Sequence, residues 1–123
     1  MSATKLDAAG MIKLKTLGEA ALVLHKIHAL VERMAIDVKA QRPVGVIPQQ
    51  VKRVATPLQG QLKGQFSLIA DQVAQLILVA GRGGSDQVRL RALRELVAQL
   101  RTAVEIAEAK VREQHTVPIE KIG

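Results

Sequence analysis

The chain of 123 residues is almost free of aromatic side chains. It has no Trp and no Tyr, and Phe66 is its single aromatic residue. Its core must therefore be built from Leu, Val, Ile, Ala and Met, and Ala and Leu are strong helix formers. The shortage also excludes aromatic platforms for stacking single-stranded nucleic acids, because Phe66 lies on an apolar stripe that we expect to be buried.

Cysteine is absent as well. Its absence excludes disulfides, thiol chemistry and cysteine-ligated zinc, and it is compatible with the cytoplasmic location that we expect. The N-terminal residues contain no apolar run of the signal-peptide type. No stretch approaches the roughly 20 uninterrupted apolar residues of a membrane helix, so the sequence predicts no membrane partner.

Acidic residues are few, and the basic excess is concentrated in the middle of the chain. There are 18 Lys and Arg against 11 Asp and Glu, which gives a formal net charge of +7. Residues 42–94 hold eight basic and two acidic side chains, and so carry six of these seven charges. A basic excess of this kind favours an anionic partner, most often nucleic acid.

Apolar residues recur at alternating intervals of three and four, which predicts helices with one buried stripe each. We expect the first helix over about residues 12–41, since Pro43 disfavours helix at the residue before it. A second stripe covers residues 48–80, and a third helix is expected over residues 85–114. The second stripe consists of Val51, Val54, Leu58, Leu62, Phe66, Ile69, Val73, Leu76 and Ala80.

Pro57 lies inside the second stripe, which keeps its phase across it. We therefore expect one long helix kinked at Pro57, or two helices stacked nearly end to end. Short connections make consecutive helices antiparallel. The predicted fold is all-α: a single domain, residues 1–123, forming an antiparallel bundle of three long helices completed by oligomerisation. Residues 1–11 and 115–123 are expected to be flexible ends.

Residues 81–85, with the sequence GRGGS, raise the question of a phosphate site. They lack the spacing of a P-loop, and no strand precedes them, which excludes a P-loop and a dinucleotide fingerprint. A glycine that ends one helix and Ser85 as the cap of the next explain the stretch structurally. The alternative is that Arg82 and the free backbone amides of the next helix hold a phosphate.

The arginines that follow are spaced to share one helix face, away from the apolar stripe. A charged face is often only solvated, but Glu95 is the only acidic residue between Arg89 and Arg101. Without aromatics, Arg and Lys can still bind the phosphates of duplex or structured nucleic acid. The predicted nucleic-acid-binding residues are Lys52, Arg53, Lys63, Arg82, Arg89, Arg91, Arg94 and Arg101.

No set of residues predicts catalysis or a bound cofactor. His25 and His28 lie one turn apart on a helix, but they lack the further ligands that a metal ion needs. Ser, Thr and the carboxylates are too scattered to form a catalytic set. We therefore expect no enzymatic activity, no metal and no cofactor.

The run from Leu76 to Ala80 is apolar all round, whereas a helix in a three-helix bundle needs only one apolar stripe. The excess predicts an oligomer contact formed by Leu76, Ile77, Leu78 and Val79. The alternative is that the N-terminal segment of the same chain buries this run.

The segments LKGQFSLIADQV and AGRGGSDQVRLRALRELVAQLRTAVEIA, between residues 62 and 107, resemble a small four-helix-bundle family. This family includes the ribosomal-RNA intervening-sequence proteins and the accessory proteins of diversity-generating retroelements. Its aromatic-rich first helix and its final long helix have no counterpart here. The similarity is carried, with a one-residue offset, by Gly81, Arg82, Gly83, Ser85, Arg91 and Arg94.

The resemblance implies a non-enzymatic basic bundle, often a ring-like homo-oligomer, that binds nucleic acid or a nucleic-acid-binding enzyme. Together with the charge distribution, it leads us to expect an accessory protein whose basic face contacts RNA or DNA. The alternative is a scaffold module whose basic face recognises an acidic or helical protein.

Overall fold

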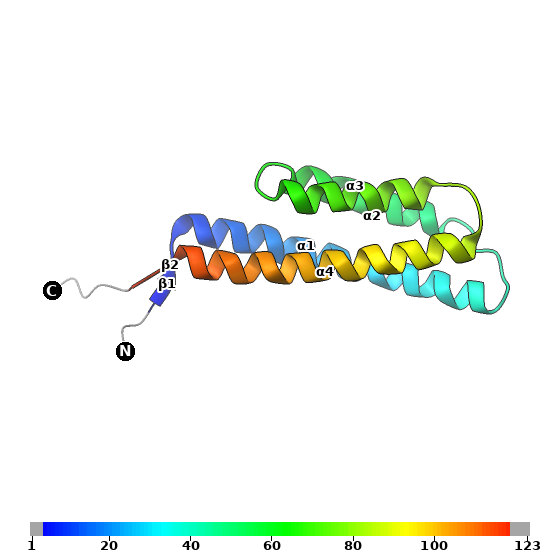
Figure 1. Cartoon of the computed structure of the whole chain (residues 1–123), viewed down its shortest axis with the longest axis horizontal. Helices are drawn as coiled ribbons and strands as arrows, with labels where there is room; N and C mark the ends of the chain where they lie inside the picture. Colours follow the sequence, from blue (N-terminus) through cyan, green and yellow to red (C-terminus); the bar gives the residue numbers. More distant parts are fainter. Residues whose placement is uncertain (1–3, 119–123) are drawn as a thin grey trace.

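The structure, a computed structural model, describes residues 4–118, which are almost entirely helical (Figure 1). Along the chain, the elements are β1 (Thr4–Leu6), α1 (Ala8–Lys39), α2 (Ile47–Leu62), α3 (Ser67–Gly81), α4 (Asp86–His115) and β2 (Thr116–Pro118). The all-α class predicted from the apolar periodicity is confirmed.

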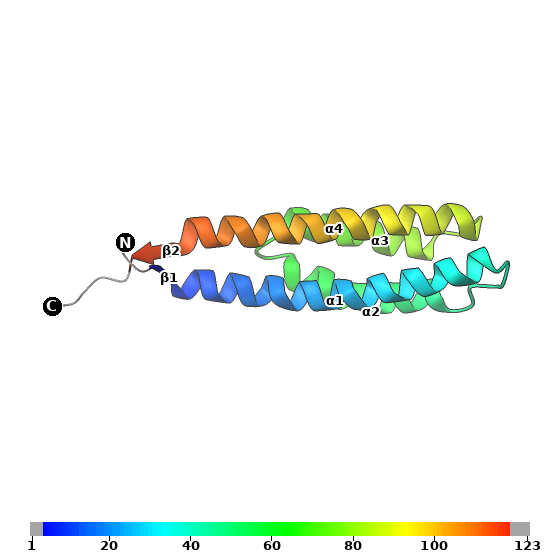
Figure 2. The same ribbon diagram turned by 90° about the horizontal axis from the view of Figure 1, so that it is seen from below.

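The helices form two antiparallel pairs of different length. α1 and α4 make the long pair, and the shorter pair of α2 and α3 packs along it (Figures 1 and 2). α1 and α4 have 32 and 30 residues, whereas α2 and α3 have 16 and 15. At about 1.5 Å per residue, the long pair is about twice the length of the short one. It extends beyond the short pair chiefly at the end where α1 begins and α4 ends (Figure 1).

Local capping signals define where the helices begin. The Asp7 carboxylate accepts a hydrogen bond from the backbone amide of Gly10 at 2.7 Å, which caps α1. Ser85 caps α4 as predicted, since its hydroxyl accepts from the amide of Val88 at 3.5 Å. Pro48 stands in the first turn of α2, where a missing backbone donor costs nothing.

The predictions of one long second helix and of two helices stacked nearly end to end are both wrong, because the chain reverses within that stretch. α2 ends at Leu62 and α3 begins at Ser67, so residues 63–66 form a turn. The apolar stripe continues in phase across this turn, since both short helices bury it in the same core. Pro57 lies inside α2, and a kink there stays a prediction. Residues 4–118 thus form four helices rather than three.

The chain ends also differ from the prediction of flexible segments. β1 pairs antiparallel with β2, so that Lys5 lies opposite Val117, and α1 already begins at Ala8. Much of residues 4–11 and 115–118 is therefore strand or helix rather than free tail. Residues 1–3 and 119–123, which fell under the same prediction, lie outside the described part of the chain.

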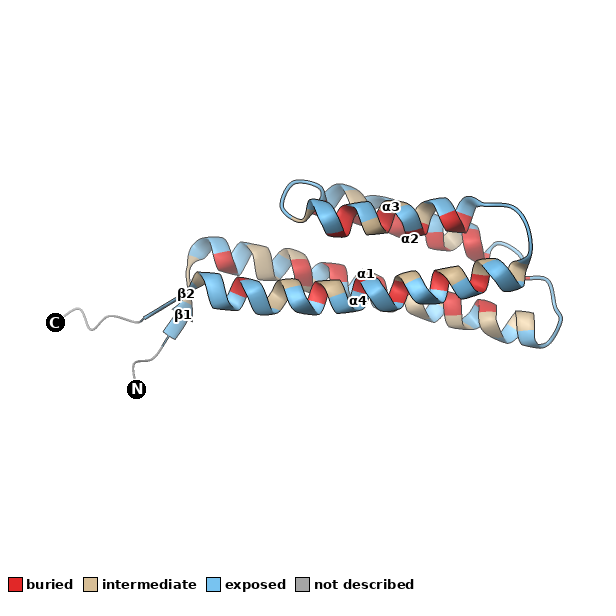
Figure 3. Ribbon diagram, in the orientation of Figure 1, coloured by how far each residue is buried: buried red, intermediate tan, exposed pale blue. Residues whose placement is uncertain are grey.

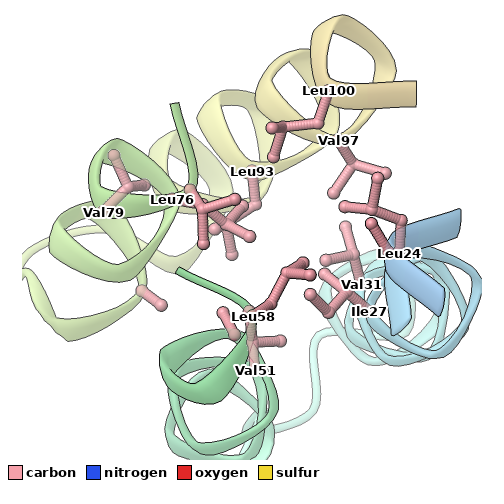
Figure 4. Packing of buried hydrophobic residues seen from close by; sticks show 14 of the residues in the cluster. Leu24, Ile27, Val31, Val51, Leu58, Leu76, Val79, Leu93, Val97 and Leu100 are labelled. Atoms are coloured by element: carbon pink, nitrogen blue, oxygen red, sulfur yellow. The ribbon is translucent and has the colours of Figure 1, made fainter. Parts of the chain in front are cut away.

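The core lies between the four helices and contains no aromatic side chain (Figures 3 and 4). Within residues 4–118 no polar or charged residue is buried. Phe66, the one aromatic residue, packs half-buried against the edge of the core. The largest fully buried side chains are Leu17, Leu24, Ile27, Val31, Met34, Val51, Leu58, Leu62, Val73, Leu76, Leu93 and Leu100.

Candidate nucleic-acid interface

The predicted nucleic-acid-binding residues lie on three parts of the fold rather than on one surface. Lys52 and Arg53 are exposed on α2, and Lys63 directly follows the last residue of α2. Arg82 stands in the turn between α3 and α4. The other four belong to α4 and are Arg89, Arg91, Arg94 and Arg101.

Arg89 holds the α3–α4 turn together instead of facing solvent. Its guanidinium donates to the Asp86 carboxylate at 2.7 Å and to the backbone carbonyl of Arg82 at 2.9 Å. Only 17% of its side chain is exposed. Arg89 is therefore engaged within the chain, which does not support the phosphate contact predicted for it.

Asp86 disfavours the phosphate site considered for residues 81–85, because it places a carboxylate at the start of α4. It is the first residue of α4, where a carboxylate complements the positive end of the helix dipole. A phosphate at this helix start would meet that negative charge. The turn itself needs glycine at Gly84, whose φ is 111°, while Gly83 has no positive φ. Ser85 caps α4 as the structural explanation requires, but α3 is followed by Arg82 with φ −76°, so the positive-φ glycine leads into α4 and does not end α3.

Arg94 links the two long helices. Its guanidinium donates to the carboxylate of Glu32 in α1: Nη2 to Oε2 at 2.7 Å and to Oε1 at 3.1 Å, and Nε to Oε2 at 3.1 Å. Both side chains are partly exposed, so the pair stays near solvent. Because Glu32 neutralises Arg94, this arginine is less available to a phosphate than its position on the helix suggested.

A groove between α1 and α4 lies on both sides of this bridge. On one side it has a volume of about 840 Å³ and is lined by Arg91 together with Ile36 and Lys39 of α1. On the other side a smaller hollow of about 290 Å³ is lined by Arg101 and His28. The arginines that share one face of α4 therefore point to α1, and not toward the lysine and arginine of α2.

Lys52 does not line the groove between α1 and α4 but lies near the end of α3. Its Nζ lies 3.9 Å from where a Cβ on Gly81 would stand, and Gly81 is the last residue of α3. The unpaired carbonyls of a helix C-terminus favour a cation there. Tertiary packing thus brings Lys52, and Arg53 beside it, close to the turn that carries Arg82. Lys63 lies 11 residues further along, about 16 Å away at the other end of α2.

Several of the predicted cations are left without an internal partner. Within residues 4–118, three arginines form ion pairs with a carboxylate closer than 4.0 Å: Arg42 with Asp37, Arg89 with Asp86, and Arg94 with Glu32. The cations of the predicted set that have no such partner are Lys52, Arg53, Lys63, Arg82, Arg91 and Arg101. These side chains can pair with anions from outside the chain.

The fold buries part of the apolar run that was predicted to contact another subunit and leaves the rest exposed. Leu76 is 0% exposed and Val79 is 8% exposed, because the chain itself covers both. Ile77 is half-buried, and Leu78 is 61% exposed. The oligomer contact therefore stays a prediction for Ile77 and Leu78, and it does not extend to the two buried residues.

A polar cluster at the chain ends was not anticipated from the sequence. The imidazole of His115, at the end of α4, lies with Nδ1 3.1 Å from an Asp7 carboxylate oxygen and Nε2 3.1 Å from Nζ of Lys13. The hydrogen bond from the backbone amide of Gly10, and then His115 and Lys13, hold the pKa of Asp7 below its ordinary value despite opposing desolvation. The one available signal was Asp7 as a cap residue ahead of an apolar stripe; nothing pointed to its partner 108 residues away.

In the described part of the chain, no group of three His, Asp or Glu side chains is arranged to hold a metal ion. None of the helices there combines the length and the hydropathy that a membrane span requires.

The fold and the charge define a basic four-helix bundle of two unequal helix pairs. Comparison with protein-family models, with curated protein sequences and with solved structures gives no match for this chain.

Proposed function

We propose that this protein is a non-catalytic, homo-oligomeric bundle that binds the phosphate backbone of nucleic acid. The observation that carries the proposal is a group of cations that have no carboxylate partner within residues 4–118, located where α2 begins, α3 ends and α4 begins. Nζ of Lys52 lies beside Gly81, the last residue of α3, and Arg82 follows Gly81 directly. The three cations Lys52, Arg53 and Arg82 form this basic group.

The chemistry of this group favours backbone contacts over base readout. Lys and Arg neutralise phosphates whatever the sequence, and they displace counterions when they do so. No aromatic side chain accompanies the group, so stacking of single-stranded bases is not supported. A duplex or a structured RNA, whose phosphates form a regular surface, is the partner that fits best.

The test compares two variants with the same loss of charge. Lys52→Gln, Arg53→Gln and Arg82→Gln together remove three cations from the proposed site. The control replaces three exposed cations elsewhere, namely Lys15→Gln, Lys26→Gln and Arg112→Gln. Fluorescence anisotropy with labelled RNA and DNA duplexes would be measured over a range of salt concentrations.

We expect the site variant to bind more weakly and to lose about one unit of salt slope for each phosphate contact removed. The control should keep most of the slope. Equal binding by the site variant and the wild type would overturn the proposal. Equal losses in both variants would mean that net charge, and not this group, attracts the nucleic acid.

The oligomeric part of the proposal depends on Leu78, a large apolar side chain near the C-terminal end of α3 that is 61% exposed. Leu78→Lys should reduce the particle size seen by light scattering without changing the helix content, because the residue lies outside the core. A wild-type mass of 13.3 kDa at micromolar concentration would contradict homo-oligomerisation.

A second candidate function is recognition of an acidic amphipathic helix in the groove between α1 and α4. There Ile36 is 62% exposed, and the groove is lined by Lys39, Arg91 and Arg94 as well as by Glu32 and Glu95. An exposed apolar side chain among charged ones suits the apolar face of an amphipathic helix, and the basic side chains outnumber the acidic ones by one. Ile36→Ser separates the two functions, because it removes apolar surface but no charge and should leave nucleic-acid binding unchanged.

A further inference from the structure

A notch opens where the short helix pair ends and the long pair continues, at the opposite end of the bundle from the basic group. It has a volume of about 480 Å³, within the roughly 300–1,000 Å³ typical of small-molecule sites. Apolar side chains from the α2–α3 turn, α3 and α4 line much of it, and two lysines, Lys13 and Lys110, line it as well. The apolar lining includes Phe66, Leu68, Ile69 and Ile106.

Lys13 differs in its hydrogen bonding from the other lysines of residues 4–118. Among residues 4–118 it is the one lysine whose ammonium contacts an imidazole, with 3.1 Å between Nζ and Nε2 of His115. The far ring nitrogen, Nδ1, faces both carboxylate oxygens of Asp7 at 3.1 and 3.3 Å. Amine, imidazole and carboxylate thus stand in the order of a nucleophile, a base and the group that orients the base.

The partners determine where the imidazole carries its hydrogen. An ionised carboxylate can only accept, so Nδ1 donates to Asp7; an ammonium can only donate, so Nε2 accepts from Lys13. In this tautomer Nε2 is directed at the amine and is free to take a proton from it. Asp7 then stabilises the imidazolium that forms, as the orienting carboxylate does in other triads.

The backbone keeps the imidazole in this position. The amide of Asp7 donates to the carbonyl of His115 at 2.9 Å, and the paired strands β1 and β2 continue beyond it. Gly10 allows the close approach, since a Cβ at this residue would lie 2.5 Å from Cβ of His115. The array therefore belongs to the folded end of the bundle, where the two long helices meet.

We propose that Lys13 is an acyl-acceptor site that reacts with acyl thioesters carrying an apolar chain. The chain would lie in the notch against Phe66, Leu68 and Ile106, which places the thioester carbonyl near Nζ. Leu68 is 80% exposed and Ile106 is 53% exposed, so their apolar surface is open to such a chain. This proposal is independent of nucleic-acid binding, because it uses none of the same residues.

The reaction is a simple acyl transfer. Lys13 first loses one proton to water and then attacks the carbonyl carbon as a neutral amine. The C–N bond forms and the C–S bond breaks; the nitrogen gives its second proton to Nε2 of His115. The departing thiolate takes that proton back from the imidazolium and leaves as a thiol, so the products are an amide on Lys13 and a free thiol.

The test measures acylation of each lysine by mass spectrometry after incubation with the octanoyl thioester of N-acetylcysteamine. Lys110 is the internal control, since it lines the same notch without a base beside it. Lys15 reports the rate of an exposed lysine outside the notch. We expect Lys13 to react at least about tenfold faster than both, a modest share of the 10²–10⁴-fold that a positioned base can supply.

Variants separate chemistry from structure. His115→Gln should lower the rate at Lys13 to that at Lys15, and imidazole added to His115→Ala should restore part of it, which a purely structural role would not allow. Gly10→Ala should slow Lys13 too, because its Cβ displaces the imidazole while all three chemical groups remain. Circular dichroism verifies that each variant folds.

The chain length of the thioester tests the notch itself. The octanoyl ester should favour Lys13 over Lys15 more strongly than the acetyl ester does. If both esters give the same ratio, the notch does not bind the chain. If Lys13 reacts no faster than Lys15 in the wild type, or if added imidazole restores nothing, the proposal is overturned.

Discussion

Two leucines on α3 provide a direct measurement of how this bundle is stabilised. Leu76 is 0% exposed in the core between the helices, whereas Leu78, two residues later on the same helix, is 61% exposed (Figure 4 shows Leu76). Leu76→Ala and Leu78→Ala remove the same atoms and carry the same change in helix propensity. The difference between their effects is therefore due to burial alone.

The expected magnitudes differ several-fold. Leu76→Ala leaves a cavity in a closed core and should cost about 2–5 kcal/mol of unfolding free energy. Full burial of a leucine contributes about 1.5–3 kcal/mol, and Leu78 has less than half of its surface covered, so Leu78→Ala should cost about 0.5–1 kcal/mol. With a urea dependence of about 2 kcal/mol per molar, a loss of 3 kcal/mol lowers the unfolding midpoint by about 1.5 M.

Urea titration followed by far-ultraviolet circular dichroism is the suitable assay, because a chain without Trp and Tyr has no useful intrinsic fluorescence. Each titration should be repeated at two protein concentrations. A cost of Leu78→Ala that grows with concentration reports a subunit contact. If Leu76→Ala and Leu78→Ala lower the free energy of unfolding by equal amounts at both protein concentrations, the packing of α3 described above is refuted.

Three further predictions concern the turn, the helix bridge and the chain ends. Gly84→Ala should cost about 1–2 kcal/mol because φ there is 111°, whereas Gly83→Ala should be neutral or slightly stabilising; thermal melts of both variants decide this. A double-mutant cycle with Arg94→Gln and Glu32→Gln should give a coupling of about 0.2–1 kcal/mol that falls with added salt, and a coupling of zero at low salt would contradict the bridge. The pKa of Asp7 is lowered first by the backbone hydrogen bond from Gly10 and then by His115 and Lys13, so its stabilising contribution is present above the unfolded pKa and is lost as pH falls through the folded one. Asp7→Asn should therefore flatten the decline of melting temperature below about pH 4, and an unchanged decline would count against the capped geometry.

The candidate site was partly predictable from the sequence. The spacing of Arg91, Arg94 and Arg101 placed them on one face of a helix, and they do line the same groove beside α1. What spacing cannot reveal is which cations already have partners. Arg94 meets a carboxylate 62 residues away along the chain, and such a contact leaves no local pattern.

Arg89 illustrates the same limit at short range. Its partner Asp86 is only three residues away, and the pair was visible as an ordinary helical spacing. The sequence did not reveal that the guanidinium also reaches back to the carbonyl of Arg82 and closes the turn. That hydrogen bond depends on the conformation of the turn between α3 and α4, which is determined by how the two helices pack.

Local information in the sequence determined the all-α class, the core-facing stripes and the N-terminal cap of α4, because helix periodicity and capping involve residues within about four positions of one another. Tertiary structure alone decided that residues 63–66 reverse the chain, since a stripe that stays in phase is compatible with a straight helix and with a hairpin. It likewise decided that Leu76 is covered while Leu78 is not. The pairing of Asp7 with His115 arises for the same reason: only the antiparallel packing of the two long helices brings the ends of the chain together.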